Sequence, residues 1–171
     1  MKILSAVCAF LSACSVAVYL ISGHAFSLTV AFCTTTYHLL MRLLVGYAIN
    51  GIFHNRMDYA RPWFKQRKFE RKLYRILKVR KWKGLMPTYA PDSFSAEKHS
   101  LPEIAGAMCQ AEIVHEVIIP LSFLPLFFVP LFGAFWAFFI TSVLSALFDS
   151  SFAIMQRFNR PRVIAFMERK A

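Results

Sequence analysis

Three ionisable residues stand close together in a part of the chain that is otherwise strongly apolar: Glu112, His115 and Glu116. Glu112 precedes His115 by three positions and Glu116 by four, so in a helix all three share one face. A carboxylate one turn away from an imidazole can orient the ring and raise its basicity, which is what a general base needs. The spacing therefore predicts His115 as a catalytic base, with Glu112 as its partner.

The depth of this cluster depends on where its helix begins. A start near Ile104 would carry the acidic residues into hydrocarbon, at a cost of about 2.5–3.5 kcal/mol each at the bilayer centre. Residues in that position usually face inward and serve function. A start at Val117 would instead leave them capping the helix in the headgroup region. Spacing alone weighs the two equally, but a late start leaves too few residues for two further spans, which favours the deeper placement.

Other polar residues interrupt the apolar blocks. His38 and Arg42 are four residues apart, so they share a helical face and could complete a polar cavity with Glu112. More ordinary roles also fit, because an intramembrane histidine often packs through a hydrogen bond and an arginine can extend to the headgroups. Asp149 is a weaker candidate for the same cavity.

No serine or cysteine lies in a convincing nucleophile setting, so the chemistry need not pass through a covalent intermediate on the enzyme. The four cysteines lie in or beside apolar blocks and lack metal-site spacing, which is typical of small packing residues. Residues 11–14 have the letters of a bacterial lipobox. However, the apolar run continues beyond Cys14 to Ile21, so residues 3–22 are expected to remain as a membrane anchor.

Composition places these residues in a membrane. The chain has 171 residues, 57% of them hydrophobic, against about 45–50% apolar residues in a soluble domain. Residues 117–148 carry no charge and as one helix would reach about 48 Å, beyond the ~30 Å hydrocarbon core. A turn at Pro130–Gly133 would divide them. We expect an all-α, polytopic single membrane domain with four transmembrane helices, at about 3–22, 25–53, 105–129 and 134–155.

A strongly basic segment separates the second and third spans, at residues 56–104. Apolar residues at helical spacing between Trp63 and Val79 predict an amphipathic helix on an anionic membrane surface: Phe69, Leu73, Ile76 and Leu77. The charge mainly indicates topology and binding of anionic lipid headgroups. It could also bind a phosphate-bearing donor. Nucleic acid is a poor fit for so aromatic a surface.

The distribution of basic residues predicts the orientation, because Lys and Arg beside spans stay in the cytoplasm. The tail at 156–171 is basic as well, and an even number of spans is needed to keep it on the same side as the basic segment. We therefore expect a multi-pass protein of the bacterial inner membrane with both termini cytoplasmic.

Three segments in order resemble the bacterial glycosyl-4,4'-diaponeurosporenoate acyltransferase family. They are residues 78–87 around Trp82, residues 111–115 with the Glu112–His115 pair, and the arginine-rich residues 156–162. The resemblance covers about residues 65–165 and implies transfer of a fatty acyl group to a sugar hydroxyl at the membrane face. Another glycolipid could also be the acceptor.

The expected reaction is direct transfer from a thioester, acyl-CoA or an acyl carrier, with no bound cofactor and no metal. The expected catalytic residues are His115, Glu112 and His38. Residues expected to bind the donor or substrate are Arg42, Lys81, Trp82, Lys83, Gln156, Arg157, Asn159, Arg160 and Arg162. Two other hypotheses stay open at this point: a dimeric proton-coupled transporter that uses Glu112, and a metal site from His38, Glu112, His115 and Glu116. A homo-oligomer is open for the enzyme too.

Overall fold

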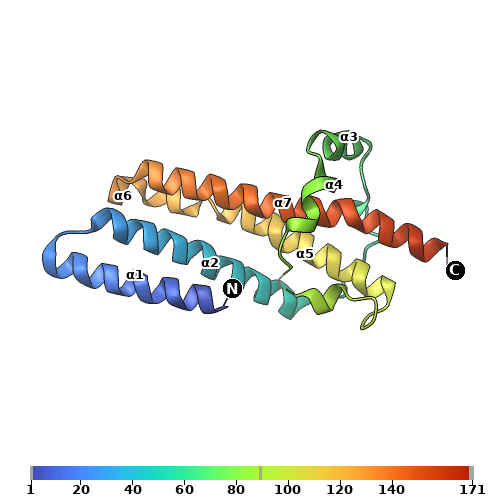
Figure 1. Cartoon of the computed structure of the whole chain (residues 1–171), viewed down its shortest axis with the longest axis horizontal. Coiled ribbons are helices and arrows are strands. Elements are labelled where there is room, and N and C mark those ends of the chain that lie inside the picture. Colours follow the sequence, from blue (N-terminus) through green and yellow to red (C-terminus); the bar gives the residue numbers. More distant parts are fainter. Residues whose placement is uncertain (1, 89, 170–171) are drawn as a thin grey trace. The chain divides into compact units, whose positions relative to one another are not determined.

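The computed structural model describes residues 2–88 and 90–169, and every regular element in that part of the chain is helical. The long helices are α1 (Lys2–Ser22), α2 (Phe26–Phe53), α5 (Leu101–Leu121) and α7 (Phe135–Glu168) (Figure 1). Short helical segments connect them: η1 (Pro62–Phe64), α3 (Lys68–Ile76), α4 (Val79–Trp82), η2 (Lys83–Leu85), η3 (Pro91–Phe94), η4 (Leu124–Phe128) and α6 (Val129–Phe132). The predicted all-α class is confirmed.

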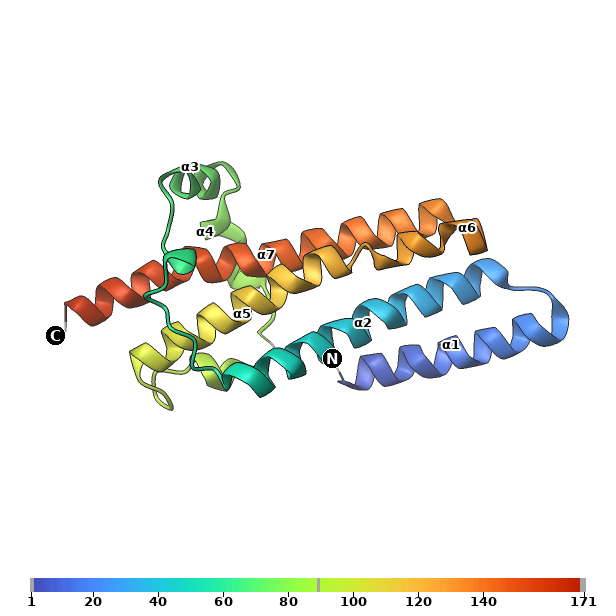
Figure 2. The ribbon, with the colours of Figure 1, turned by 180° about the vertical axis from the view of Figure 1, so that it is seen from behind.

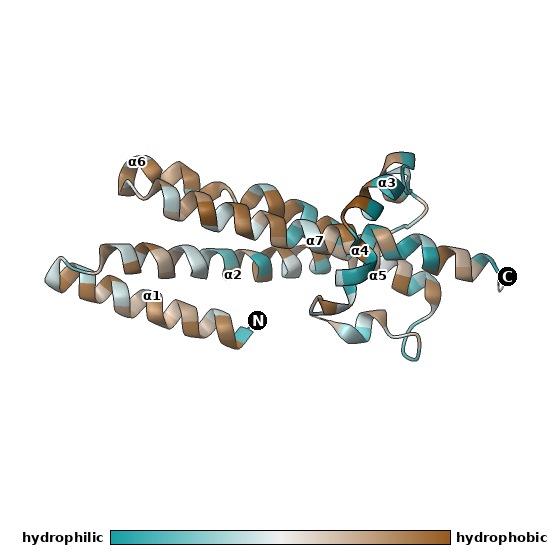
Figure 3. Cartoon of the chain, turned by 45° about the horizontal axis from the view of Figure 1, so that its top comes forward, coloured by the Kyte–Doolittle hydropathy of each residue, from teal (hydrophilic) through white to brown (hydrophobic). Residues whose placement is uncertain are grey.

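Four helical segments are long and apolar enough to cross a membrane: Lys2–Ser22, Phe26–Phe53, Leu101–Phe132 and Phe135–Glu168. The large side chains of Ile3, Leu20, Phe127 and Trp136 are between 69% and 82% exposed on these segments, and lipid is the medium that can cover them. Figure 3 shows the same contrast, with apolar residues along the long helices and hydrophilic ones around α3 and α4. The protein is a membrane protein with four candidate spans.

The chain forms two compact units. The first takes in the chain up to Tyr47 together with Val117–Phe148. Within it, α1 and the start of α2 lie side by side in both ribbon views (Figures 1 and 2). Small hydroxyl side chains join them: the hydroxyls of Ser12 and Thr36 lie 2.7 Å apart, and Thr29 donates to the Ser15 carbonyl at 3.0 Å. Close packing through small polar residues is typical of membrane helix pairs.

The second unit comprises Ala48–Glu116 and the chain from Asp149 onward. Here α3 and α4 lie beside the later half of α7 (Figures 1 and 2). The expected amphipathic helix is therefore present but broken, because Lys78 adopts a left-handed conformation with φ of 51° and reverses the chain between α3 and α4. Its predicted apolar face is exposed, with Phe69 at 60% and Ile76 at 65%. Its position on a membrane surface stays a prediction.

The third span begins earlier than expected. The basic segment was expected to continue to residue 104, but α5 starts at Leu101 rather than near residue 105. The reason is a capping box, since the backbone N–H and hydroxyl of Ser100 both donate to Oε2 of Glu103 at 2.8 Å. A start well before Val117 was the favoured alternative, and the structure confirms it.

The third span also ends differently from the prediction. The α-helix stops at Leu121, not at residue 129, and continues as η4 and α6. Pro125 and Pro130 occupy the first turns of these two segments, where their missing N–H groups cost nothing. The reversal occurs at Gly133, the last residue of the predicted turn, with φ of 63°.

The helix that contains the fourth predicted span continues beyond residue 155, where the span was expected to end. Helix α7 runs unbroken to Glu168 and contains Pro161, so the predicted tail at 156–171 is the last part of this helix. Lys170 and Ala171 lie outside the described residues. The arginines of this region therefore have fixed positions along a helix, and within the second unit they can contact the basic segment and α5.

Candidate active site

A histidine and an aspartate from different helices meet in the second unit. Nδ1 of His115 on α5 lies 2.8 Å from Oδ1 of Asp149 on α7. The Asp149 side chain is fully buried, whereas that of His115 is 21% exposed. Phe152 stacks on the imidazole with ring centroids 4.7 Å apart. A buried carboxylate on Nδ1 fixes the tautomer and orientation of the ring and directs Nε2 to chemistry.

The residue that holds His115 is therefore Asp149, and the predicted partner Glu112 has another role. Each Glu112 carboxylate oxygen accepts from an arginine: Oε1 from Nη1 of Arg157 at 2.6 Å, and Oε2 from Nη1 of Arg160. The Glu112 and Arg160 side chains are at most 1% exposed. The spacing of three residues between Glu112 and His115 predicted that they share a face of α5. However, both carboxylate oxygens of Glu112 accept hydrogen bonds from arginines of α7.

These arginines belong to a wider charge network. Nη2 of Arg157 donates to Oε1 of Glu70 at 2.8 Å, and Nη2 of Arg160 donates to the Phe64 carbonyl at 2.6 Å. Glu116 takes part as well, through Trp63 Nε1 at 3.0 Å and Arg157 at 3.7 Å. The network ties the basic segment to α5 and α7, and charges this buried are tolerated only when paired.

Tyr74 completes the network on the side of α3. Its hydroxyl donates to Oε2 of Glu70 at 2.8 Å. Burial, followed by this hydrogen bond and the charge of Glu70, raises the pKa of Tyr74 above its ordinary value. The phenol therefore stays protonated and acts as a constant donor.

The expected donor-binding arginines thus divide into two groups. Arg157 and Arg160 are engaged in the network, and a role for them in donor binding stays a prediction. Arg162 is exposed and lies over the Phe158 ring at 4.1 Å. Gln156 is buried on the same helix.

The basic segment contacts this end of α7 through Lys83. Its Nζ donates to Oδ1 of Asn159 at 2.6 Å and lies 5.3 Å from the Phe158 ring centroid. Burial lowers the pKa of Lys83, and the charges of Arg162 and Arg80 lower it further. Trp82 donates from Nε1 to the Leu77 carbonyl at 2.9 Å, which closes the turn rather than reaching outward. The remaining expected residue, Lys81, lines a nearby cavity.

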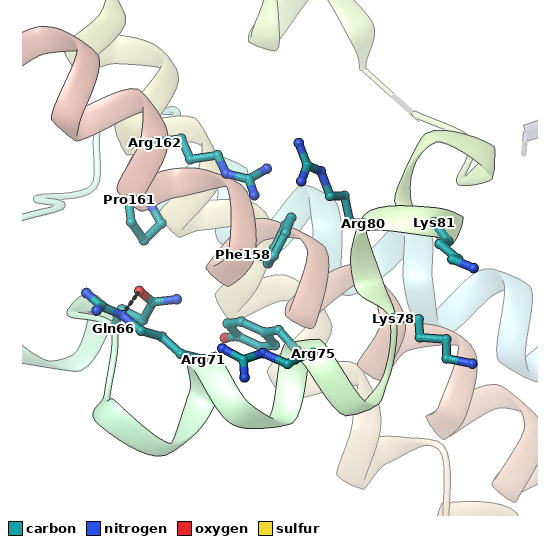
Figure 4. A pocket seen from close by; sticks show the side chains of 10 residues that line it. Gln66, Arg71, Arg75, Lys78, Arg80, Lys81, Phe158, Pro161 and Arg162 are labelled. Atoms are coloured by element: carbon teal, nitrogen blue, oxygen red, sulfur yellow. Dashed lines mark hydrogen bonds between the residues drawn. The ribbon is translucent and has the colours of Figure 1, made fainter.

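That cavity has a volume of about 510 Å³ and lies among α3, α4 and α7 (Figure 4). Its lining is largely basic and aromatic and contains no acidic side chain: Gln66, Arg71, Tyr74, Arg75, Lys78, Arg80, Lys81, Phe158, Pro161 and Arg162. Sequence reasoning identified the charge of this segment but not its concave form, which depends on the reversal at Lys78.

His38 and Arg42 belong to the first unit. Arg42 donates from Nη1 to the His38 carbonyl at 2.8 Å and from Nη2 to the Ser145 hydroxyl at 2.7 Å. The Ser145 hydroxyl lies 3.0 Å from that of Ser122, and His38 packs edge-on against Tyr37. The structure thus gives Arg42 a bridging role between α2 and α7. That either residue joins the chemistry of His115 stays a prediction.

The described part of the chain contains no group of three His, Cys, Asp or Glu side chains placed so that they could hold a metal ion. The four cysteines are free thiols. The second unit thus contains an oriented imidazole on α5 and a basic, aromatic cavity among α3, α4 and α7.

Comparison with known proteins identifies the family. The sequence profile described as CrtO, glycosyl-4,4'-diaponeurosporenoate acyltransferase, matches residues 60–169. This stretch holds the basic segment, α5 and α7, and with them His115, Asp149 and the charge network. Comparisons with curated proteins and with solved structures give no match. Since the profile covers well over half of the chain, this protein belongs to the glycosyl-4,4'-diaponeurosporenoate acyltransferase family and is an acyltransferase.

Proposed function

We propose that this enzyme transfers a fatty acyl group from a thioester to a hydroxyl of a glycosylated, membrane-borne acceptor, with His115 as the general base. The observation that carries the proposal is the 2.8 Å contact between Nδ1 of His115 and Oδ1 of the fully buried Asp149. It leaves Nε2 as the basic nitrogen, and among the described residues no hydrogen bond occupies that atom.

The chemistry is a single acyl transfer. Nε2 of His115 accepts the proton of the attacking hydroxyl as its oxygen bonds to the thioester carbonyl carbon. The carbon–sulfur bond then breaks, and the thiolate recovers the proton from the imidazolium. Asp149 stabilises the imidazolium that forms in between and keeps the ring in the productive tautomer. General-base assistance of this kind contributes about 10²–10⁴-fold to a rate.

The acceptor follows from the family. A glycosylated carotenoid-like lipid presents a sugar hydroxyl at the membrane face while its apolar chain stays in the bilayer. The exposed apolar surface of the spans and of α3 suits such a substrate. Any glycolipid with a comparable sugar would offer the same nucleophile. The setting is a bacterial inner membrane with the basic segment and both termini in the cytoplasm, where acyl thioesters are made.

A proton-coupled carrier is the alternative that the intramembrane glutamate suggested. A carrier needs a carboxyl group that gains and loses a proton during transport. Glu112 is bound by Arg157 and Arg160 through both of its oxygens, so neither oxygen is open to a transported ion or substrate. The geometry therefore favours the enzyme.

The test uses the full chain purified into lipid nanodiscs, a radiolabelled acyl thioester and a glycosylated carotenoid or glycolipid. Label should move to the lipid with the wild type, and the His115→Gln variant should lose at least about a hundredfold in rate. Undiminished transfer by a folded His115→Gln protein would exclude His115 as the base.

A further inference from the structure

The cavity among α3, α4 and α7 is lined by cationic side chains that take no part in the charge network around Glu112. Six of its lining residues are cationic, and none is acidic. The buried carboxylate of Glu70 is bound by Arg157 and by Tyr74, whose side chain lines the cavity, and Glu70 itself is not among the lining residues. In the described part of the chain, neither Arg75 nor Arg80 has an ion pair. Cations gathered in a concavity without counter-charge attract a polyanion.

The four arginines of the cavity surround a concave space, whereas those of a flat basic patch would all face open solvent. Figure 4 shows the side chains of Arg80 and Arg162 extending on the same side of Phe158, with Arg71 and Arg75 along the α3 side of the cavity. The charges of Arg80 and Arg162 both lower the pKa of Lys83, which lies next to the cavity residues Lys81 and Phe158. Guanidinium groups placed in this way can bind phosphate oxygens through paired hydrogen bonds.

Aromatic and apolar groups form the rest of the wall. Tyr74 and Phe158 meet edge to face, with ring centroids 5.6 Å apart and planes at 89°, and Pro161 lies beside them. A volume of about 510 Å³ suits a compact ligand rather than a protein surface. The site therefore favours a ligand that carries several phosphates together with a flat ring.

We propose that this cavity binds the phosphoadenosine pyrophosphate end of a coenzyme A thioester, which makes acyl-CoA the donor. The inference rests on the proposed function, because only an acyl transfer gives such a ligand a role. Coenzyme A carries a 3′-phosphate, a pyrophosphate and an adenine, which match the arginines and the aromatic wall. An acyl carrier protein would instead dock through an acidic helix on an open surface, and phosphatidylglycerol would offer a single phosphate and no flat ring.

The test is titration calorimetry of unacylated coenzyme A against the full chain in nanodiscs of uncharged lipid. The Arg75→Gln/Arg80→Gln variant should lose about tenfold or more in affinity, because two charged hydrogen-bonding groups are removed. The matched control is Arg56→Gln/Arg169→Gln, which removes the same charge from exposed arginines outside the cavity and should bind within about twofold of the wild type. Dephospho-coenzyme A should bind more weakly than coenzyme A.

Several outcomes would overturn the proposal. They are equal loss in both double variants, equal binding of coenzyme A and inorganic phosphate, full competition by phosphatidylglycerol, and binding of acyl carrier protein in place of coenzyme A. The two proposals fail separately. His115→Gln should retain coenzyme A binding while losing transfer. Transfer from an acyl carrier without coenzyme A binding would remove the cavity assignment and leave His115 in its role.

Discussion

His115 and Asp149 are 34 positions apart in sequence, yet Nδ1 of one lies 2.8 Å from Oδ1 of the other. The contact joins α5 to α7 inside the second unit, and Phe152, one turn beyond Asp149, stacks on the imidazole. One helix thus supplies the base, and the other supplies both the carboxylate and the aromatic ring that restrain it. The predictions below follow from this division of roles.

Asp149 is a positioning residue, and its effect should be separable from folding. Asp149→Asn retains the size of the side chain but removes the charge that stabilises the imidazolium. We expect kcat to fall by about a hundredfold or more while KM and thermal stability change little. The measurement is steady-state acyl transfer in nanodiscs beside a thermal melt. Parallel loss of stability and activity, with kcat per folded molecule unchanged, would show that Asp149 serves only the fold.

Glu112 should behave in the opposite way. Glu112→Gln removes the carboxylate that Arg157 shares with the buried Arg160, which costs about 3–5 kcal/mol in the free energy of unfolding. A double-mutant cycle measures the interaction between Glu112 and Arg160. The double variant Glu112→Leu/Arg160→Met should lose less unfolding free energy than the sum of the losses in Glu112→Leu and Arg160→Met. Reversible unfolding in mixed micelles provides the four values of this cycle. Strictly additive costs would contradict a direct interaction.

The backbone at Asn55 and Met57 passes close to Gly106 on α5, and two glycines of α2 without such neighbours serve as controls. A Cβ at Gly106 would lie 3.0 Å from the Met57 carbonyl oxygen and 3.1 Å from that of Asn55, both backbone atoms. Gly106→Ala should therefore destabilise the protein by about 1–3 kcal/mol. Gly46→Ala and Gly51→Ala on α2 meet nothing within 4 Å and should be neutral or stabilising by up to about 1 kcal/mol. Thermal melts of the three variants compare them directly, and equal behaviour would refute the contact.

Lys83 should make the stability of the protein depend on pH in the alkaline range. Its pKa in the folded protein is lowered from the ordinary 10.5, first by burial and then by Arg162 and Arg80. The unfolded chain therefore binds this proton more tightly, so the free energy of unfolding should rise with pH between the lowered value and 10.5. Lys83→Met, which keeps the apolar stem, should flatten that rise. An identical pH slope in both proteins would contradict the assignment.

The fold was largely predictable from the sequence, because long uncharged runs must cross a bilayer as helices. The four spans and the reversal ending at Gly133 followed from run length and proline or glycine positions alone. The start of α5 was missed although its signal was present, in the capping-box pattern of Ser100 and Glu103. The break of the amphipathic helix at Lys78 had no such signal, since nothing in a lysine indicates a positive φ.

The site was predictable only in part. His115 stood out as an ionisable residue in an apolar context, and Asp149 could be named only as a weaker candidate. Helical spacing finds partners three or four residues away, but a partner on another helix depends on how the helices pack. The same limit explains why Glu112 was expected to orient His115, whereas in the structure arginines of α7 bind Glu112.

The most direct test of the central claim is comparative lipid mass spectrometry of bacterial cells that make the glycosylated acceptor, with either the wild-type chain or its His115→Gln variant at equal membrane levels. We predict a lipid heavier than the acceptor by one fatty acyl group in wild-type cells and its loss in His115→Gln cells. The same acylated lipid in equal amount in both would contradict general-base catalysis by His115.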